Sequence, residues 1–268
     1  MSQAAVIELR AVSKRFSKSP DVLCGVDLQV CKGEIVTLLG PSGCGKTTVL
    51  RLIAGLTPPT TGEVRVHLPA GDTSDARFPA AWGGISYVFQ DPTLMPWASV
   101  LANVRLPLDL AGVDRETAHD RALQALASVG LQRVPHLRPH ELSGGMRMRA
   151  SIARALVTQP TLLLMDEPFA ALDEITRHKL DADLLRLCAQ RSISVLFVTH
   201  SIYESVFLSH RVLVMGANPG RVIADVGISE PHPRSSSFRV STRFAHYAQQ
   251  LQEQLIQASG GNPEEAMA

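Results

Sequence analysis

The nine residues from Gly40 to Thr48 read GPSGCGKTT, which is the composition of a loop that binds phosphate. Glycines let backbone N–H groups turn toward phosphate oxygens because no Cβ intervenes. A helix beginning at Lys46 would point the positive end of its dipole at the same anion. The Lys46 ammonium would reach the β- and γ-phosphates, and the Thr47 hydroxyl would hold Mg²⁺. The predicted binding residues are Gly40, Pro41, Ser42, Gly43, Cys44, Gly45, Lys46, Thr47 and Thr48.

Two acids follow the most apolar segment of the chain. Residues 161–165 read TLLLM and predict a buried strand, and Asp166 and Glu167 come directly after it. Because ligands of α/β proteins bind at the carboxyl ends of strands, Asp166 would hold the Mg²⁺ that bridges the β- and γ-phosphates. Glu167 would polarise the attacking water as a general base. Two surface acids at a solvated strand end are the alternative, which the glycine loop upstream disfavours.

The elements around these residues follow from hydrophobic periodicity. The apolar run 35–39 predicts a buried parallel strand directly before the loop, and 48–54 has helical spacing that Gly55 ends. Further strands are expected at 6–9, 23–30, 64–66, 85–89, 161–165, 193–198, 211–215 and 221–226, the last two as edge strands. Helices are expected near 99–110, 115–129, 144–158 and 174–190, with a short helix capped by Ser201 and its capping-box partner Glu204.

Alternating strands and helices around a phosphate loop predict the α/β class with a mostly parallel sheet. The helix-only block at about 91–158 predicts an inserted helical subdomain. We expect residues 229–237, SEPHPRSSS, to be a linker. An amphipathic stripe follows at 244–255, and we expect the last ten residues to be disordered.

Composition narrows the function. The 268 residues contain 26 Lys and Arg against 25 Asp and Glu, so no global charge favours nucleic acid. The four cysteines, Cys24, Cys31, Cys44 and Cys188, include no C-x-x-C pair, so neither a zinc site nor a disulfide framework is indicated. No window approaches about 18 consecutive apolar residues, and the first residues do not resemble a signal segment. A role at a membrane would therefore require docking on another protein.

The motifs together resemble the ATP-binding subunit of an ABC transporter, over about residues 6–228. The matching pieces are GPSGCGKTT, Gln90 after a strand, LSGG at 142–145, LLLMDEP at 162–168, ALD at 171–173, and Thr199-His200. The resemblance implies a P-loop NTPase fold with a mostly parallel sheet core, an antiparallel β subdomain and an inserted helical subdomain. It implies one ATPase domain over 1–228, followed by a linker, an amphipathic helix and a tail over 229–268.

The resemblance also implies roles for residues outside the loop, with ATP and Mg²⁺ as cofactors. Gln90 would reach the Mg²⁺ and the nucleophilic water, and His200 would contact the γ-phosphate. Phe16 would stack on adenine, although an ordinary core phenylalanine is the alternative. Cys44 we interpret as a small side chain that the loop tolerates.

The LSGG segment bears on the oligomeric state. Ser143 can cap the following helix, and the backbones of Gly144 and Gly145 allow a phosphate to approach closely. In the family, two chains sandwich two ATP molecules head to tail, and each chain lends this segment to the nucleotide of the other. Asp173 would lie between the two sites. The resemblance therefore implies a homodimer, or a heterodimer with a second ATP-binding subunit.

Within the family, the chain looks like the nitrate, sulfonate and taurine branch of importers. Met146 and Met148 stand where many members carry glutamine, and DPTLMPW at 91–97 and NPGR at 218–221 resemble that branch. An importer subunit would sit peripherally on the cytoplasmic face of the inner membrane. Its partners would be transmembrane permease subunits and, indirectly, a periplasmic solute-binding protein, with no nucleic acid.

Two other functions stay open. One is the ATPase of an exporter, which the segment after Gln90 and the absence of a span in the chain disfavour. The other is a soluble ABC ATPase that acts on ribosomes or DNA. Such proteins usually carry two ATPase halves or a long coiled-coil insertion, and this sequence shows neither.

Overall fold

The computed structural model describes residues 4–17, 20–68 and 84–258. The chain divides into two compact units, one formed by Met1–His67 with Leu184–Ala268 and the other by Leu68–Asp183. The ten terminal residues expected to be disordered lie outside the described residues. Among the described residues, no helix combines the length and the apolar character needed to cross a bilayer.

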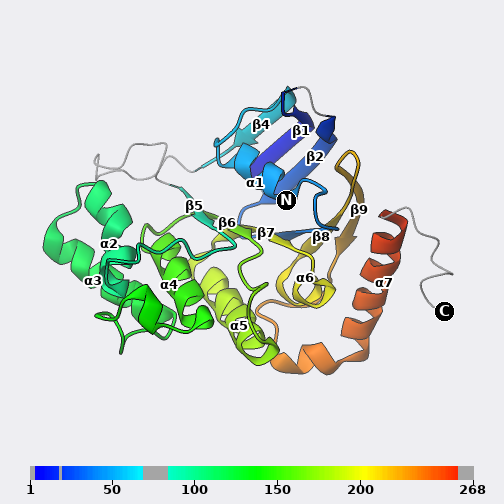
Figure 1. The fold of residues 1–268 in the computed structure, drawn as a ribbon. Coiled ribbons are helices and arrows are strands. Elements are labelled where there is room, and N and C mark those ends of the chain that lie inside the picture. The colour runs from blue at the N-terminus through cyan, green and yellow to red at the C-terminus, as the bar shows by residue number, and fades with distance from the viewer. Residues whose placement is uncertain (1–3, 18–19, 69–83, 259–268) are drawn as a thin grey trace. The chain divides into compact units, whose positions relative to one another are not determined.

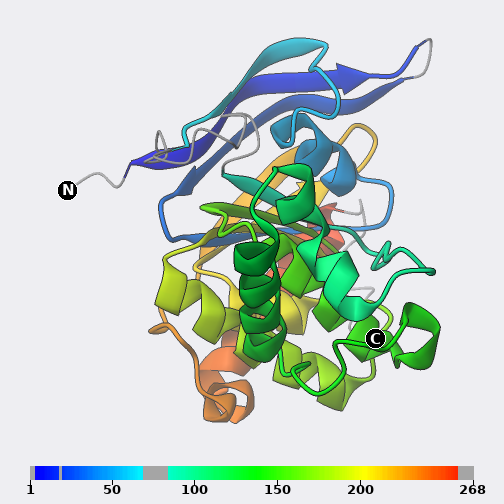
Figure 2. The same ribbon diagram turned by 90° about the vertical axis from the view of Figure 1, so that its left-hand side faces the viewer.

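The first unit contains a three-stranded antiparallel sheet in the order β2-β1-β4, seen as blue and cyan arrows in Figure 2. Its strands are β1 (Ala5–Arg15), β2 (Asp21–Cys31) and β4 (Thr61–Val66). The predicted strands at 6–9 and 23–30 are confirmed, and both are longer than the apolar pattern suggested. In β2 the side chains of Val26, Leu28 and Val30 are buried at every second position, as one buried face requires.

Four more strands of this unit pair in the order β7-β3-β8-β9. They are β3 (Ile35–Leu39), β7 (Ser194–Thr199), β8 (Arg211–Gly216) and β9 (Arg221–Gly227). β3 pairs in parallel with both β7 and β8, and all its residues are buried, as expected for a strand covered on two faces. The expectation that 211–215 is an edge strand is wrong, because β8 lies between β3 and the antiparallel β9.

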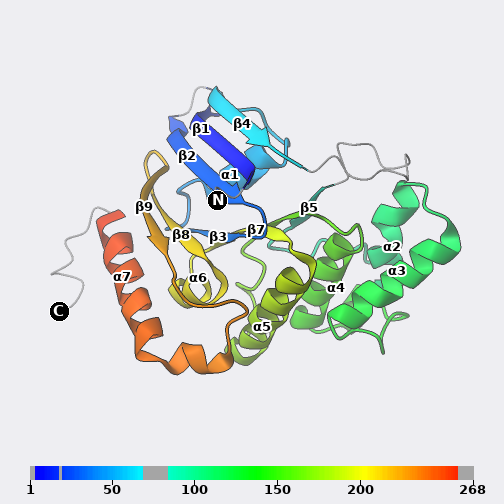
Figure 3. The same cartoon turned by 180° about the vertical axis from the view of Figure 1, so that it is seen from behind.

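Two helices near the carboxyl end of the chain pack against this sheet. They are α6 (Ile202–Leu208) and α7 (Thr242–Ala258), and α7 contacts both α6 and β8 (Figure 3). Phe244 and Leu251 form the buried stripe of α7, which confirms the amphipathic pattern. Phe244 also packs edge-on against Phe238 of the 3-10 helix η2 (Ser236–Val240), with ring centroids 5.2 Å apart.

The segment 229–237 is docked on the fold. Arg234 is buried, and its Nη1 donates to the carbonyl oxygens of Val206 and Phe207, each at 2.8 Å. Burial lowers the pKa of Arg234 to about 10. An arginine that satisfies the last carbonyls of α6 holds this segment in one place, so it is not the free linker that its composition suggested.

The second unit contains the parallel pair β5 (Ile85–Val88) and β6 (Leu162–Asp166) and most of the helices drawn in green in Figure 1. Its helices are α2 (Val100–Leu110), α3 (Arg115–Ser128), η1 (Pro139–Glu141) and α4 (Gly144–Leu156). The helix α5 (Glu174–Arg191) begins here and ends in the first unit. Ser99 and Asp114 cap α2 and α3 by accepting backbone N–H bonds, so the predicted starts are confirmed.

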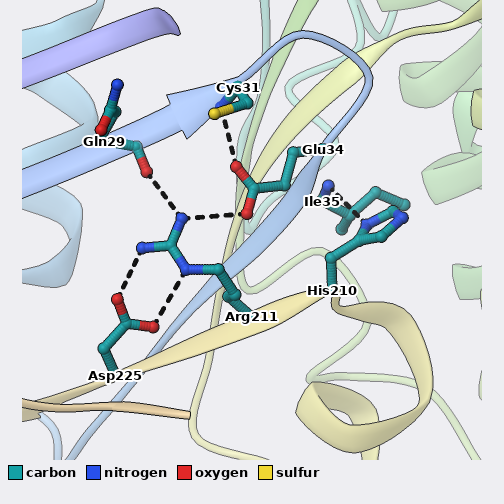
Figure 4. Close-up of polar contacts among 7 residues, drawn as sticks. All are labelled: Gln29, Cys31, Glu34, Ile35, His210, Arg211 and Asp225. Atoms are coloured by element: carbon teal, nitrogen blue, oxygen red, sulfur yellow. Dashed lines mark hydrogen bonds and ion pairs between the residues drawn. The ribbon is translucent and has the colours of Figure 1, made fainter. Parts of the chain in front are cut away.

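An ionic network joins four strands at the amino end of β3 (Figure 4). Arg211 on β8 donates to Glu34 at 3.0 Å, to Asp225 on β9 at 2.6 and 3.1 Å, and to the carbonyl of Gln29 at 3.3 Å. Glu34 also accepts the backbone N–H of Cys31 at 2.8 Å. Hydrogen bonding to Asp225, then to Glu34, raises the pKa of Arg211 above its usual value. The guanidinium thereby cross-links β2, β3, β8 and β9.

A pair of stacked histidines lies next to this network. The rings of His210 and His232 are parallel within 10°, with centroids 3.8 Å apart, and Nδ1 of His210 accepts the N–H of Ile35 at 3.0 Å. Burial first, and then the charge of Arg234, lowers the pKa of both rings, that of His232 to about 3. Both imidazoles are therefore neutral in the folded protein at neutral pH.

Candidate functional site

The glycine loop connects β3 to the helix α1 (Lys46–Ile53), as the sequence predicted. Gly43 has φ of 80° and Gly45, the N-cap of α1, has φ of 96°, both in the left-handed region that favours glycine. Such a backbone can turn N–H groups inward, and the N-terminus of α1 adds a partial positive charge. Ser42 is exposed, Thr47 and Thr48 at the start of α1 are half-buried, and the Cys44 side chain is buried.

Lys46 supplies the charge of the loop. Its side chain is only 5% exposed, and Nζ donates to the carbonyl of Gly40 at 2.7 Å and to that of Pro41 at 3.0 Å. Both acceptors belong to the loop itself, so the ammonium lies within the curve that the loop describes. A cation at this position, with glycine N–H groups around it, fits a phosphate anion.

His200 lies next to the glycine loop, at the carboxyl ends of the parallel strands. Leu39 of β3 is directly opposite Thr199 of β7, so Gly40 and His200 follow neighbouring parallel strands at the same end. His200 is exposed. Behind it, Ser201 accepts the N–H of Glu204 at 3.3 Å and starts α6, and the buried Glu204 carboxylate accepts the Thr199 hydroxyl. The predicted cap by Ser201 is confirmed, but the capping box is wrong, because the N–H of Ser201 donates to the Thr199 hydroxyl and not to Glu204.

Phe16 follows β1 in the same unit. Its side chain is 42% exposed, which is too open for an ordinary core phenylalanine. The ammonium of Lys14 lies 4.8 Å from the ring centroid, in the position of a cation–π contact. An accessible aromatic ring of this kind can stack on a base.

The second unit brings the two acids and Gln90 to one edge. Val88 of β5 is opposite Met165 of β6, so Gln90 and Asp166 lie at the carboxyl ends of paired parallel strands. Asp166 is 8% exposed, and its Oδ2 accepts the hydroxyl of Tyr87 at 3.1 Å. The contact of Tyr87 with Asp166 could not be predicted from the sequence, because it depends on the register of β5 against β6.

Glu167 has an unusual backbone. Its φ of 43° is in the left-handed region, which residues other than glycine seldom adopt. Strained backbone of this kind is concentrated at functional positions, where the surrounding structure fixes the direction of a side chain. The half-buried Glu167 is followed by the buried Phe169, which anchors the turn.

The LSGG segment starts α4 in the predicted way. Ser143 accepts the N–H of Met146 at 3.3 Å as the N-cap, and Ser143 and Gly144 are both exposed. Gly145 is buried, and a Cβ on it would lie 2.9 Å from Cγ2 of Thr176, so α4 and α5 meet here without a side chain between them. The start of this helix is exposed, and the N-terminus of a helix attracts anions.

The two methionines of the signature differ in position. Met148 is 4% exposed, on the predicted core face of α4 that also includes Ile152, Ala155 and Leu156. Met146 is half-buried in the first turn of the helix. Met148 therefore has a packing role.

Asp173 begins α5, close in the chain to the residues that meet Gly145. Its Oδ1 accepts the N–H of Thr176 at 2.9 Å, and this hydrogen bond lowers the pKa of Asp173. A carboxylate that caps a helix stays ionised at neutral pH.

Several known proteins are similar to this chain. A model of the ABC transporter family matches residues 23–170. The aliphatic sulfonates import ATP-binding protein SsuB 1 of Xanthomonas axonopodis pv. citri is 43% identical over 230 residues, which are 85% of this chain and 88% of that protein. The taurine import ATP-binding protein TauB of Rhizobium johnstonii is 44% identical over 210 residues, 78% of each chain.

A solved structure has the same fold. It is a dimeric ATP-binding cassette in a post-hydrolysis state bound to ADP and Pi. The match has a TM-score of 0.71 and 32% sequence identity, and it covers 84% of this chain and 100% of the other.

Proposed function

Because this chain belongs to the ABC transporter family, we propose that it is the ATP-hydrolysing subunit of an importer for a small nitrate-, sulfonate- or taurine-like solute. The observation that carries the proposal is the glycine loop, in which Lys46 is held at the N-terminus of α1 by the carbonyls of Gly40 and Pro41. In this proposal the loop residues Gly40–Thr48 bind the phosphates of ATP, and Phe16 stacks on adenine.

Magnesium is the metal that the donor set fits. Mg²⁺ is usually bound through one or two carboxylates together with phosphate oxygens and water, not by a cage of protein ligands. The described residues contain no group of three or more His, Cys, Asp and Glu that could form such a cage. We propose Thr47, Gln90 and Asp166 as its protein partners. The ion would neutralise charge that develops on the transferred phosphoryl group.

Glu167 is the proposed general base, and Gln90 and His200 are the proposed partners of the water and the γ-phosphate. The left-handed φ of Glu167 supports the assignment, since such strain persists where a side chain must be aimed. For this chemistry, most of the catalysis comes from positioning and from neutralising charge.

We propose that the exposed start of α4 completes the nucleotide site of a second subunit. Ser143, Gly144 and Gly145 would meet the nucleotide of the partner chain, and Asp173 would lie at the interface between the two chains. The exposure of Ser143 and Gly144 at a helix N-terminus supports this role. A homodimer is the simplest assembly, and a heterodimer with a second ATP-binding subunit uses the same contacts.

The segment after Gln90 is the proposed contact with the permease, on the cytoplasmic face of the membrane. Asn103, fully buried on α2, bonds the backbone of Met95, and Arg154 on α4 donates to the carbonyls of Pro92 and Thr93 at 3.0 and 2.9 Å. Trp97 at the end of the segment is 73% exposed. The segment is thus fixed to the helix that starts at Ser143, which supports a mechanical link from nucleotide to permease.

The test is the variant Glu167→Gln. It keeps the shape of the side chain and removes the base, so ATP should still bind while hydrolysis falls about 10²-fold or more. Size-exclusion chromatography with Mg-ATP should show a dimer that persists, and a phosphate-release assay should show lost turnover. Glu116→Gln, an exposed glutamate in the first turn of α3, is the matched control. Hydrolysis by Glu167→Gln at the rate of the unmutated protein would exclude Glu167 as the base.

The solute is tested by reconstituting this chain with a candidate permease and a candidate solute-binding protein of a sulfonate or taurine importer. Proteoliposomes that contain the complex should take up taurine or an alkanesulfonate only with ATP and the binding protein present. Glu167→Gln in the same complex should abolish uptake. Uptake of neither sulfonate nor nitrate, with another solute carried, would refute the assigned substrate class but not the ATPase.

A further inference from the structure

The turn between β8 and β9 reaches the glycine loop, although some 175 residues separate them in the chain. The N–H of Gly220 donates to the carbonyl of Val22 at 2.9 Å, and the carbonyl of Gly220 accepts the N–H of Cys24 at 2.9 Å. These two bonds form an isolated parallel bridge between Leu23 and Gly220. The tip of the β8–β9 hairpin is thus fixed to the start of β2.

Gly220 lies in close backbone contact with the glycine loop at Cys44. A Cβ on Gly220 would lie 2.1 Å from the carbonyl oxygen of Cys44 and 2.9 Å from Cδ2 of Leu23. Its φ lies outside the left-handed region, so backbone conformation does not demand glycine. Glycine is required because the two backbones are in contact and leave no room for a side chain.

Two loop glycines also lie too close to their neighbours to carry a Cβ. A Cβ on Gly45 would lie 2.5 Å from Cδ2 of Leu23, and a Cβ on Gly40 would lie 2.6 Å from the carbonyl of Met215, at the end of β8. Leu23 and Met215 are fully buried. The loop is therefore supported at its first glycine by β8 and at its last by β2 and the hairpin turn.

We infer that Gly220 is a positioning residue for nucleotide binding. It acts through the loop, since its backbone fixes the Cys44 carbonyl and thereby the direction of the N–H groups between Pro41 and Gly45. The inference rests on the proposed function of the loop as the ATP phosphate site. It gives the NPGR sequence at 218–221 a physical role that the motif alone did not supply.

The experiment compares Gly220→Ala with Gly227→Ala in the full chain. Gly227 lies on β9, and a Cβ there would meet nothing within 4 Å, so it is the matched control. Titration calorimetry with ATP, well below the thermal midpoint of each variant, gives the dissociation constant. We expect a rise of about tenfold or more for Gly220→Ala, as for the loss of a hydrogen bond to a charged group, and no rise for Gly227→Ala.

A second readout separates positioning from mere support of the fold. Hydrogen exchange of the amides 41–45 should accelerate in Gly220→Ala, and KM for ATP should rise more than kcat falls. If Gly220 only supported the fold, the thermal midpoint would fall while the dissociation constant of the folded protein stayed within about twofold. That outcome would overturn the inference.

Two further variants make every result decisive. Lys46→Ala should lose ATP binding, and normal binding by this variant would refute the loop as the phosphate site, a failure distinct from that of Gly220. If Gly220→Ala does not fold, Leu23→Val is the alternative variant, because it removes the Cδ2 atom that lies close to both Gly45 and Gly220. A dissociation constant raised about threefold, with faster exchange at 41–45, would then support positioning, and unchanged values would overturn it.

Discussion

The two ends of β3 differ in how they hold charge. At the amino end, Glu34 is bonded to Arg211, which is bonded in turn to Asp225, so opposite charges meet side chain to side chain. At the carboxyl end, Lys46 donates to the neutral carbonyls of Gly40 and Pro41. The amino end of β3 therefore holds an ionic cross-link of the sheet, and the carboxyl end leads into the glycine loop and its lysine.

The backbone differs in the same way. Ile35–Leu39 and its neighbours are regular parallel strands up to the last residue, and left-handed glycines then follow at positions 43 and 45. Glycine adopts such angles without strain, and the loop is packed closely against Met215, Leu23 and Gly220. We therefore expect substitutions at the carboxyl end of β3 to affect nucleotide binding most and those at the amino end to affect stability most.

The substitution with the greatest consequence for nucleotide binding lies at the carboxyl end of β3. Lys46→Ala should weaken ATP binding about 10²-fold or more, because the loop loses its only mobile point charge toward phosphate. The free energy of unfolding should also fall, by about 1–3 kcal/mol, because the buried carbonyl of Gly40 loses its donor. Calorimetry with ATP and urea unfolding measure the two quantities. Lys32→Ala, an exposed lysine near the amino end, should leave both unchanged.

Next in size is Arg211→Met at the amino end. It should lower the free energy of unfolding by about 2–3 kcal/mol, because Glu34 stays buried without its ion-pair partner. ATP affinity should stay within about twofold. Urea unfolding and calorimetry again measure both, and Arg211→Lys should recover part of the loss. A variant that binds ATP weakly but unfolds normally would erase the distinction between the ends.

Lowering the pH should also decrease the free energy of unfolding, through the two histidines near the amino end of β3. His210 and His232 have lowered pKa values in the folded protein, so their stabilising contribution is full above the unfolded pKa near 6.5 and is lost as pH falls toward the folded pKa, about 3 for His232. Arg234 opposes their protonation, and Glu34 favours that of His210. Because both rings are partly exposed, we expect a loss of only about 1–2 kcal/mol from pH 7 to pH 5.

Urea unfolding at pH 7, 6 and 5 measures this loss. His232→Gln should flatten the dependence, and protonation of His210 should cost the bond from the N–H of Ile35. A steeper dependence in the variant would contradict the assignment to these rings.

Asp225→Asn should have the least effect on stability. The side chain of Asp225 is 47% exposed, so Asp225→Asn should cost less than about 1 kcal/mol even though its contact with Arg211 is 2.6 Å long. Thermal unfolding in low and high salt checks it, since screening should remove most of the difference. A loss as large as that of Arg211→Met would mean that Asp225, and not Glu34, is the important partner of the arginine.

Local features of the fold could be predicted from sequence. The glycine loop, the caps Ser143 and Ser201, and the apolar stripe of α7 all depend on residues a few positions apart. The ABC fold followed from the joint order of the motifs. The interior position of β8 could also have been predicted, since the run VLVM at 212–215 is apolar on both faces.

Contacts set by register could not be predicted. Tyr87 reaches Asp166 only because Val88 pairs with Met165, and Arg211 meets Glu34 across 177 positions of the chain. The contact of Gly220 with Cys44 depends on where a hairpin tip ends in space. A single sequence contains no distance of this kind. The chemical roles of Glu167, Gln90, His200 and the other site residues stay predictions until the variants above are measured.

The carbonyls of Gly40 and Pro41 also have a consequence for turnover. As a phosphate departs, the Lys46 ammonium can return to two acceptors of its own loop, so no bare cation is left in a buried position. We expect the product and these carbonyls to compete for the same donor, which would favour release of the product. A site that turns over must release its product, and these two carbonyls give the Lys46 ammonium an alternative hydrogen-bond partner.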